Sequence, residues 1–470
     1  MTIPIRPPAA AWPATTPPGL RAASGARVLA AALLLVVLVV APARADAQAA
    51  SPALVFEALQ VLQAHYVDPV DVPRTLAAAV AALRRQLADA GIAADLPDLP
   101  PGLSDAEAQR AFAERFAAAA DAAAGRIPAI QLAHAAIRGM ADSFNDSHTG
   151  FLSPEQNAER RRRQQGQPGF SGVGIVLMSK DGRFYVGSVI PGGPADAAGV
   201  RAFDRIVQVN DIPTGGLTVD QVSALIRGPA GTPVTLTLKR PGISDPVVVT
   251  VTRAPIVIPS IFRAEVLPGG IGYLRLYQFV ERTGREVRAA LARLLEEGMR
   301  SLVLDLRGNG GGYLDELTSV FNALLPPGTP VYTERRQGGA VRTVRTTQIP
   351  LLPPSLPVVV LVDDASASAA ELLAAAVQES RRGVVVGSRT AGAVEASVLI
   401  DLSDGSALSV TTIRLATGRG VRLEGAGVTP DVVVELTADD LEAGVDPQFL
   451  AGVRTALQAL GRPGVGRTPF

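Results

Sequence analysis

Two serines that could act as nucleophiles, Ser366 and Ser368, lie between a buried β-like run and an apolar helix. The run at 358–362 leads into a tight turn of small residues, and the helix is expected to begin near Ala369. N–H groups at the start of that helix would point to the place where negative charge develops during acyl transfer. A serine before an apolar helix can also be only an N-cap, so this segment alone leaves both interpretations open.

Three glycines at 310–312 directly follow a second β-like run, 302–306. Because glycine has no side chain, these residues can bring a backbone N–H close to a substrate carbonyl. They could also form only a turn between a strand and a helix. Three consecutive glycines lower the stability of the backbone, however, and a turn alone does not require them.

Bases that could activate a serine at neutral pH are few in this chain. The histidines are His65, His134 and His148, and both lysines lie within 170–255. His65 and His134 lie in predicted helices and are expected to be packing or surface residues, whereas His148 lies in a polar loop, 145–150. An imidazole, with an ordinary pKa of about 6.5, suits proton exchange with a serine at neutral pH.

The elements that must position these groups change in type along the chain. Helical spacing over 52–163 predicts an all-helical region, and short β-like runs separated by Gly-Pro turns follow a linker at 164–169. From Ile271 onward strands alternate with helices, which predicts a mostly parallel sheet and a multidomain α/β protein. The expected segments are a signal peptide at 1–47, a helical region at 51–165, a β domain at 166–256, an α/β core at 257–437 and a helical tail at 438–470.

An apolar run near the N-terminus has the features of a secretory signal. Arg21 and Arg27 precede the run at 28–40, and the Ala-Arg-Ala triplet at 43–45 fits the pattern that signal peptidase cuts. Thirteen apolar residues fall short of the roughly 20 that span a bilayer, which favours cleavage. We expect an exported protein, periplasmic or extracellular, whose only membrane association would be through this segment if it stays uncleaved.

The composition argues against several classes of function. Acidic and basic residues number 44 each and no long Lys/Arg run of nucleic-acid type occurs, so nucleic-acid binding is not expected. With no cysteine and three histidines, no metal cluster is evident, and the glycines lack the Lys-Ser or Lys-Thr that follows in a phosphate-binding loop. We therefore expect neither a metal nor a cofactor.

The β region at 170–255 resembles a PDZ domain. The resemblance lies in the opening run 171–175 (SGVGI), the turn and short helix at 191–195 (PGGPA), and the run 204–210 (DRIVQVN). It implies a ligand that is a protein C-terminus, preferably apolar. Glycines in the opening run would let N–H groups converge on a carboxylate, and the next strand would take the peptide as an added strand. The expected peptide-binding residues are Gly172, Val173, Gly174 and Ile175.

Four runs between about Val67 and Val434 resemble the carboxyl-terminal processing and tricorn-like serine peptidases, the S41 type. They are 146–149 (DSHT), 304–312 (LDLRGNGGG), 366–371 (SASAAE) and 425–431 (GAGVTPD). Their order, with a PDZ-like module before the core, is highly specific. The resemblance implies an α/β core of the crotonase or ClpP type, Ser368 as the nucleophile, and the N–H groups of Gly311 and Ala369 as oxyanion donors.

The base is where the chain departs from the commoner family pattern. Most members pair the serine with a lysine 25 residues later, and that position is Ala393 here. An arginine such as Arg389 stays protonated and cannot substitute. In the tricorn-like branch the base falls on His148 and a glutamate that completes the relay falls on Glu424. We therefore expect Ser368, His148 and Glu424 as nucleophile, base and orienting acid.

Two functions of different classes remain open at this stage. The first is a serine endopeptidase whose substrates are polypeptides with exposed C-termini. The second, motivated by the missing lysine, is a catalytically inactive scaffold that binds protein C-termini through the PDZ-like module. A third option, a carrier of apolar ligands, rests only on retinoid-binding relatives of the fold, since no residue here marks a lipid pocket.

Overall fold

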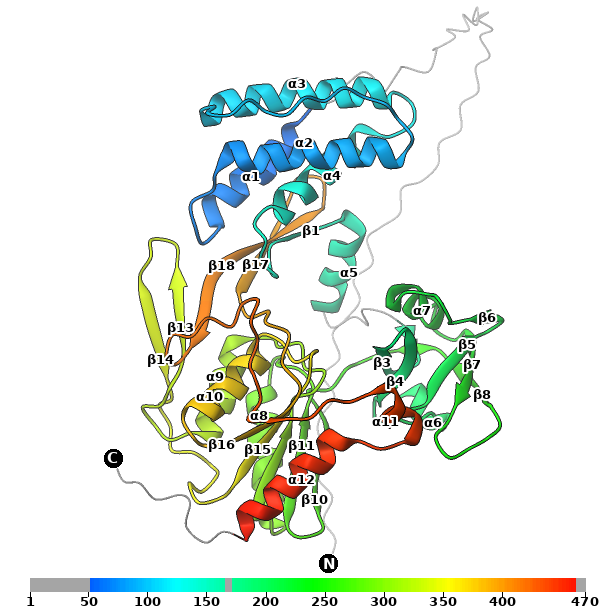
Figure 1. Ribbon diagram of the computed structural model, residues 1–470, viewed down its shortest axis with the longest axis vertical. Coiled ribbons are helices and arrows are strands. Elements are labelled where there is room, and N and C mark those ends of the chain that lie inside the picture. The colour runs from blue at the N-terminus through cyan, green and yellow to red at the C-terminus, as the bar shows by residue number, and fades with distance from the viewer. Residues whose placement is uncertain (1–50, 165–170, 462–470) are drawn as a thin grey trace, which may run out of the picture. The chain divides into compact units, whose positions relative to one another are not determined.

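The protein is described as a computed structural model over residues 51–164 and 171–461. The predicted signal segment lies outside these residues. Within them the chain forms a helical N-terminal region, a small β domain and a core with two sheets (Figure 1). No described helix is both long and apolar enough to cross a membrane.

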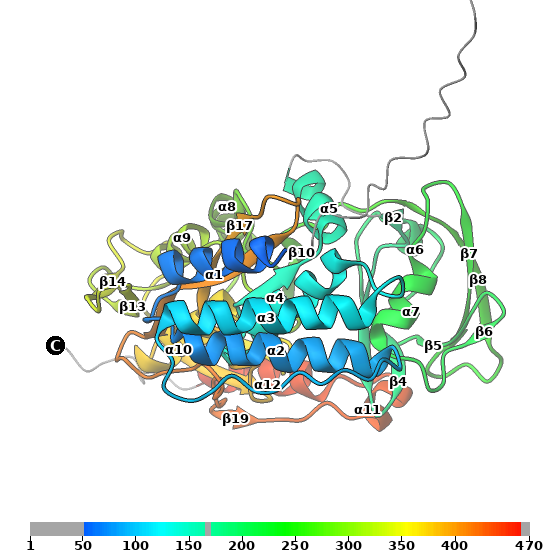
Figure 2. The same cartoon turned by 90° about the horizontal axis from the view of Figure 1, so that it is seen from above.

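The N-terminal region is helical because apolar residues recur with helical spacing and polar caps begin several of its helices. The side chain of Asp71 caps α2, and Ser104 and Glu107 form a capping box at the start of α3. Figure 2 shows α2 and α3 side by side, and α4 also packs against α2. The elements of this region are α1 (Ala53–His65), α2 (Val72–Asp89), α3 (Asp105–Ala123), α4 (Ala129–Asp142), β1 (Gly150–Leu152) and α5 (Pro154–Gln164).

The β domain is an antiparallel sheet with two short helices. Its strand order is β3-β4-β5-β7-β8, which leaves β3 at one edge. Side chains that alternate along the strands, such as Val234, Leu236 and Leu238, fill its separate apolar core. Its elements are β2 (Ser171–Gly172), β3 (Ile175–Lys180), β4 (Arg183–Val189), α6 (Pro194–Ala197), β5 (Arg205–Val209), β6 (Ile212–Pro213), α7 (Val219–Ile226), β7 (Pro233–Lys239), β8 (Val247–Thr252) and β9 (Ala254–Pro255).

The core is built on a mostly parallel sheet in the order β10-β11-β12-β15-β16-β19, in which only the β10–β11 pair is antiparallel. Helices α8, α9 and α10 cover one face and α12 packs on the other. These elements are β10 (Ile261–Leu267), β11 (Ile271–Leu276), α8 (Thr283–Glu296), β12 (Ser301–Asp305), α9 (Leu314–Leu324), β15 (Val358–Val362), α10 (Ala369–Glu379), β16 (Gly383–Gly387), β19 (Val432–Val433), α11 (Ala438–Ala443) and α12 (Pro447–Leu460).

A second, antiparallel sheet joins the core to the N-terminal helices. Its long strand β18 pairs with β1, β13 and β17, and Leu408 and Val410 of β18 pack among the helical side chains. The strands are β13 (Pro330–Arg336), β14 (Val341–Arg345), β17 (Ala396–Asp401) and β18 (Ala407–Thr417). Because β1 directly follows the polar loop at 145–149, this pairing brings that loop to the core.

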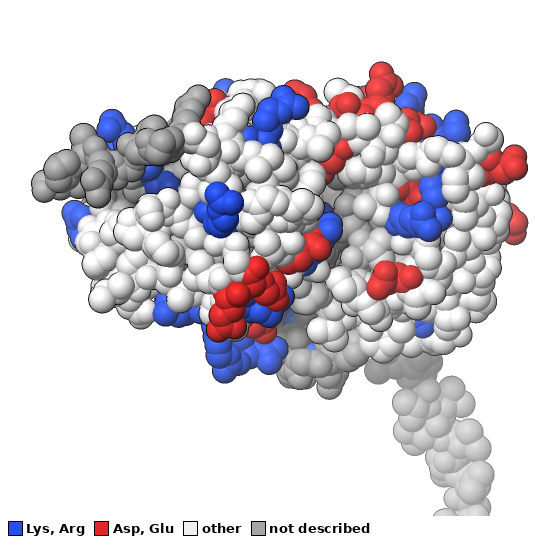
Figure 3. Space-filling model, turned by 90° about the horizontal axis from the view of Figure 1, so that it is seen from below, with Lys and Arg blue, Asp and Glu red and all other residues white. Residues whose placement is uncertain are grey.

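The predicted multidomain α/β class is confirmed, and so is the parallel sheet with helices against it. The second sheet was not predicted, because β17 and β18 follow one another with no helix between them. Acidic and basic side chains are interspersed over the face drawn in Figure 3, as the equal numbers of the two charges suggest.

Candidate active site

Ser368 lies at a sharp turn between β15 and α10. Its backbone has φ 57° and ψ −118°, a conformation that a residue with a side chain rarely adopts. Such strain persists only where the surroundings enforce it, and it occurs mostly at functional sites. Ser366 is different, since it is fully buried and its hydroxyl lies 2.9 Å from the carbonyl oxygen of Leu306. Ser368 is thus the serine of this run that lines a groove.

The turn is held by Glu371, whose side chain is fully buried. Its carboxylate accepts hydrogen bonds from the backbone N–H of Ser368 at 3.0 Å and from the hydroxyl of Thr390 at 2.6 Å. It also accepts the N–H groups of Gly392 at 2.7 Å and Ala393 at 2.9 Å. One carboxylate therefore fixes both the nucleophile's backbone and the segment where most relatives would carry a lysine.

The glycine run at 310–312 passes directly over the serine. A Cβ atom on Gly311 would lie 2.5 Å from the Cβ of Ser368, and Gly311 has φ +93°, so only glycine fits. The Gly311 N–H donates to Asn309 Oδ1 at 2.8 Å, whereas the N–H of Ala369 has no acceptor among the described residues. The N–H of Ala369 is therefore available to donate to an oxyanion. The N–H of Gly311 as the second oxyanion donor stays a prediction.

His148 lies in the same groove as Ser368, and this groove has a volume of about 720 Å³. Residues lining it include Gly310, Gly312 and Val398 of β17. We call it the catalytic groove. Ser368 and His148 form no direct hydrogen bond in the described part of the chain, although both side chains face the same space. Pairing of β1 with β18 places the loop of His148 there, and the Ser409 hydroxyl donates to the His148 carbonyl at 2.6 Å.

Glu424 contacts the histidine loop through Ser147 rather than through the imidazole. Its carboxylate accepts the Ser147 N–H at 3.1 Å, the Val394 N–H at 2.8 Å and the Glu395 N–H at 3.3 Å. The Ser147 hydroxyl in turn lies 2.6 Å from His148 Nδ1. Sequence reasoning missed Ser147, although its position next to His148 was a signal that could have identified it.

The electrostatics favour a neutral imidazole. Burial lowers the pKa of His148, and this effect outweighs the nearby charges of Glu424, Asp146 and Glu371, which raise it. Burial would raise the pKa of Glu424, but hydrogen bonds from Ser147, Val394 and Glu395 outweigh it and hold this pKa below its usual value. A neutral base beside an ionised carboxylate is the state that proton abstraction from serine requires.

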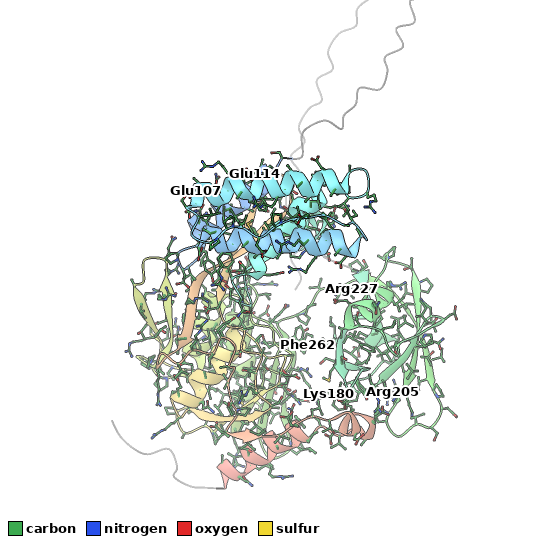
Figure 4. The ribbon with its side chains drawn as sticks, turned by 45° about the horizontal axis from the view of Figure 1, so that its top comes forward. Glu107, Glu114, Lys180, Arg205, Arg227 and Phe262 are labelled. Carbon is green, nitrogen blue, oxygen red and sulfur yellow. The ribbon has the colours of Figure 1, made fainter. Side chains whose placement is uncertain are left out.

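Other candidate bases lie elsewhere. Lys180, labelled in Figure 4, is the last residue of β3, and Lys239 is the last of β7. Both lysines therefore belong to the β domain, and neither lines the catalytic groove. His134 pairs with Asp404 at 2.7 Å, and His65 ends α1. No group of metal-binding side chains occurs within residues 51–164 and 171–461.

The predicted peptide-binding run opens the β domain beside its edge strand. Gly172 pairs with β9, and the carbonyl of Val173 accepts the Ala195 N–H at 2.8 Å. Gly174 has φ +81°, and its carbonyl accepts the Ile190 N–H at 2.9 Å. Ile175 then begins β3, whose outer edge has no partner strand among the described residues. An extended peptide could add to this edge.

Comparison with known proteins agrees with this architecture. Residues 270–434 match the model of peptidase family S41, and residues 185–240 match a PDZ domain model. Among solved structures, a photosystem II D1 C-terminal processing protease is similar with a TM-score of 0.52 and 28% identity. That likeness covers 88% of this chain and 97% of the other.

Curated relatives have the same type of name. A carboxy-terminal-processing protease of Bartonella bacilliformis is 35% identical over 317 residues, covering 66% of this chain and 71% of the relative. A chloroplastic C-terminal processing peptidase of Tetradesmus obliquus is 36% identical over 325 residues, covering 65% and 69%. The chain therefore belongs to the carboxy-terminal-processing proteases of peptidase family S41, and it is a serine-type peptidase with a PDZ domain.

Proposed function

We propose that this protein is an exported endopeptidase that binds protein C-termini through its PDZ domain and cleaves peptide bonds through an acyl-enzyme on Ser368. The observation that carries the proposal is that a strained serine and a half-buried histidine of lowered pKa line one groove, with the N–H of Ala369 next to that serine in the chain. These are the nucleophile, oxyanion donor and base that acyl transfer needs.

In the proposed reaction the Ser368 Oγ attacks the scissile carbonyl carbon while its proton passes to His148. The carbonyl oxygen becomes an oxyanion that the N–H of Ala369 and an N–H of the glycine run stabilise. The intermediate collapses when His148 returns the proton to the departing amine, which leaves the acyl-enzyme. Water then attacks the ester with His148 as base, and the carboxylic product leaves as Ser368 recovers its proton.

Ser147 and Glu424 orient the base in this scheme. The hydroxyl of Ser147 contacts Nδ1 of His148, so the other ring nitrogen, Nε2, is the one available to Ser368. Glu424 holds the Ser147 backbone in turn. Serine–histidine contacts are often long before substrate binds and tighten in the complex, so the missing hydrogen bond between Ser368 and His148 does not argue against this base.

The PDZ domain supplies recognition in this proposal. The free edge of β3 and the glycine-containing run before it offer main-chain groups to an extended tail and its carboxylate. Export rests on the basic residues, apolar run and Ala-Arg-Ala triplet within residues 21–45. Locating the protein in fractionated cells and reading the N-terminus of its mature form tests export separately.

An inactive scaffold that binds C-termini is the second candidate, because Ala393 replaces the usual lysine and no Ser368–His148 hydrogen bond is formed in the described chain. Incubating wild type, Ser368→Ala and His148→Ala with unfolded polypeptides, each with a free or an amidated C-terminus, separates the two. We expect wild type to cleave, preferring free C-termini, and both variants to lose at least about a thousandfold in rate. Binding of the tails without any wild-type cleavage would establish the scaffold instead.

A further inference from the structure

The loop that carries His148 is fixed by Asp146, a side chain with no direct contact to the imidazole. Its carboxylate accepts the backbone N–H of His148 at 3.0 Å and that of Thr149 at 2.6 Å. It also accepts the hydroxyl groups of Thr149, Thr411 and Tyr66 at 3.0, 2.9 and 3.0 Å. Burial would raise the pKa of Asp146, but these donors outweigh it and hold this pKa below its usual value.

Tyr66 connects that carboxylate to the N-terminal helices. It follows α1, is 4% exposed, and its ring packs against Phe144 with centroids 4.2 Å apart. Its hydroxyl donates to Asp146 and accepts from Arg414 Nη2 at 3.0 Å. The hydroxyl oxygen of Tyr66 therefore connects the carboxylate of Asp146, 80 residues away in the chain, to the guanidinium of Arg414, 348 residues away.

Arg414, on β18, connects the network to Glu395, a residue that lines the catalytic groove. Its guanidinium binds Asp68 at 2.9 Å and the buried Glu395 at 3.0 Å. The backbone N–H of Glu395 donates to Glu424, which holds Ser147 beside the imidazole. These contacts form a closed ring of hydrogen bonds that includes the base. Its members are Asp146, Tyr66, Arg414, Glu395, Glu424, Ser147 and His148.

We propose that Tyr66 and Arg414 are positioning residues for catalysis, which fix the His148 loop against the groove through Asp146 on one side and Glu395 on the other. This inference rests on the proposed role of His148 as the base. In most family members, by resemblance, the base is a lysine on the segment that Glu371 anchors. Here the base is on a separate loop, so its distance from Ser368 depends on contacts from the N-terminal helices and β18.

Removing the hydroxyl of Tyr66 tests the ring of hydrogen bonds with little change in the shape of the side chain. Tyr66→Phe keeps the packed ring but leaves Asp146 and Arg414 each without one partner. Because displacing a reacting group by about 1 Å can slow a reaction roughly a hundredfold, we expect kcat to fall by about ten- to hundredfold with KM unchanged. Arg414→Lys, which keeps the charge but loses the fork that reaches three partners, should show the same defect.

The measurements use the full-length protein and a quenched peptide taken from the polypeptide that wild type cleaves fastest. Two further measurements accompany the steady-state kinetics. The rate at which a fluorophosphonate labels Ser368 reports on the reactivity of the nucleophile, and an NMR titration reports the pKa of each histidine. Three histidines make these signals assignable. Burial lowers the pKa of His148, while the charged groups acting on its imidazole, Glu424, Asp146 and Glu371, raise it. If a variant loosens the loop and exposes the imidazole to water, the burial effect weakens and His148 should titrate at a higher pH than in wild type.

Tyr332→Phe is the matched control, because Tyr332, in β13, is also 4% exposed and takes part in none of the hydrogen bonds that connect Asp146 to Glu395. It should leave kcat and the His148 titration unchanged. If Tyr66→Phe kept wild-type kcat, labelling rate and titration, or if Tyr332→Phe lost as much activity, the positioning role would be wrong. A fully active His148→Ala would instead refute the proposed base, and this result is distinct from an inactive His148→Ala with a normal Tyr66→Phe.

Discussion

The two halves of the active site are assembled from different ranges of sequence. The turn of Ser368 is fixed by Glu371, whose partners lie 3 to 22 residues from it along the chain. The loop of His148 also has local contacts from Asp146, but it is held to the rest of the molecule by partners 80 to 277 residues away, from Tyr66 to Glu424. The nucleophile is thus part of one folding unit, the parallel sheet, whereas the base depends on packing between units.

This difference has a consequence for stability. Contacts between distant segments carry a loop-closure entropy cost that local contacts do not have. The β1–β18 pairing and the N-terminal helices must both be in place before His148 faces the groove. A partially loosened molecule would therefore retain a formed serine turn while losing its base. Glutamate-to-glutamine substitutions in the turn of Ser368 and in the loop of His148 compare the two halves of the active site.

The largest effect is expected for Glu371→Gln in the serine turn. An amide of the same shape presents an NH₂ group to donors and loses the charge that strengthens the bonds, inside a site that is fully buried. We expect a loss of about 2–4 kcal/mol in the free energy of unfolding together with at least about a hundredfold in kcat. Thermal or urea unfolding and peptide cleavage measure the two effects.

Glu114→Gln on α3 serves as the control for the serine turn. That side chain is 77% exposed (Figure 4), and its loss should change stability by less than about 0.5 kcal/mol. A Glu371→Gln protein with wild-type stability and rate would show that the turn does not depend on this carboxylate.

A smaller, more selective effect is expected for Glu424→Gln on the base side. Glu424 is half-buried and accepts three N–H groups, so stability should fall by only about 1–2 kcal/mol. Because Ser147 and therefore His148 lose their anchor, kcat should fall by about ten- to hundredfold with little change in KM. Steady-state kinetics measures kcat and KM separately, at a temperature where wild type and the variant are both folded.

Glu379→Gln is the matched change on a carboxylate away from the groove. Glu379 ends α10 and accepts the Thr417 hydroxyl and the Arg419 N–H. It should lose similar stability but keep its rate per folded molecule. Equal kinetic losses in the two variants would mean that Glu424 acts only through stability.

The same difference explains what could be predicted from the sequence. The strand at 358–362, the helix that begins at Ala369 and the helical tail after Thr437 were all predicted at their observed positions, since local patterns encode them. The role of the glycine run was also predictable, and the structure gives its reason at Gly311, where a side chain would clash with Ser368.

What could not be predicted depends on distant pairing. The β17–β18 pair has no helix between its strands, so the alternation that revealed the parallel sheet gave no sign of it. The link from Tyr66 through Arg414 to Glu395 joins residues with no shared motif. Glu424 was expected to contact His148, yet its hydrogen bonds reach the histidine only through Ser147, a relation that spacing alone could not show.

The smallest expected effect is a displacement of the pH profile, and it sharpens the comparison by reporting on the base alone. Burial lowers the pKa of His148, so the neutral, active imidazole should persist as pH falls below the ordinary value of about 6.5. The acid limb of kcat/KM should therefore lie below that pH. Glu424→Gln removes a charge that raises this pKa, while Asp146 still holds the backbone of the loop and keeps the imidazole half-buried, so the limb of this variant should move lower still. A limb above 6.5 in wild type, or a shift in the opposite direction in the variant, would mean that the base is more solvated than its buried position implies.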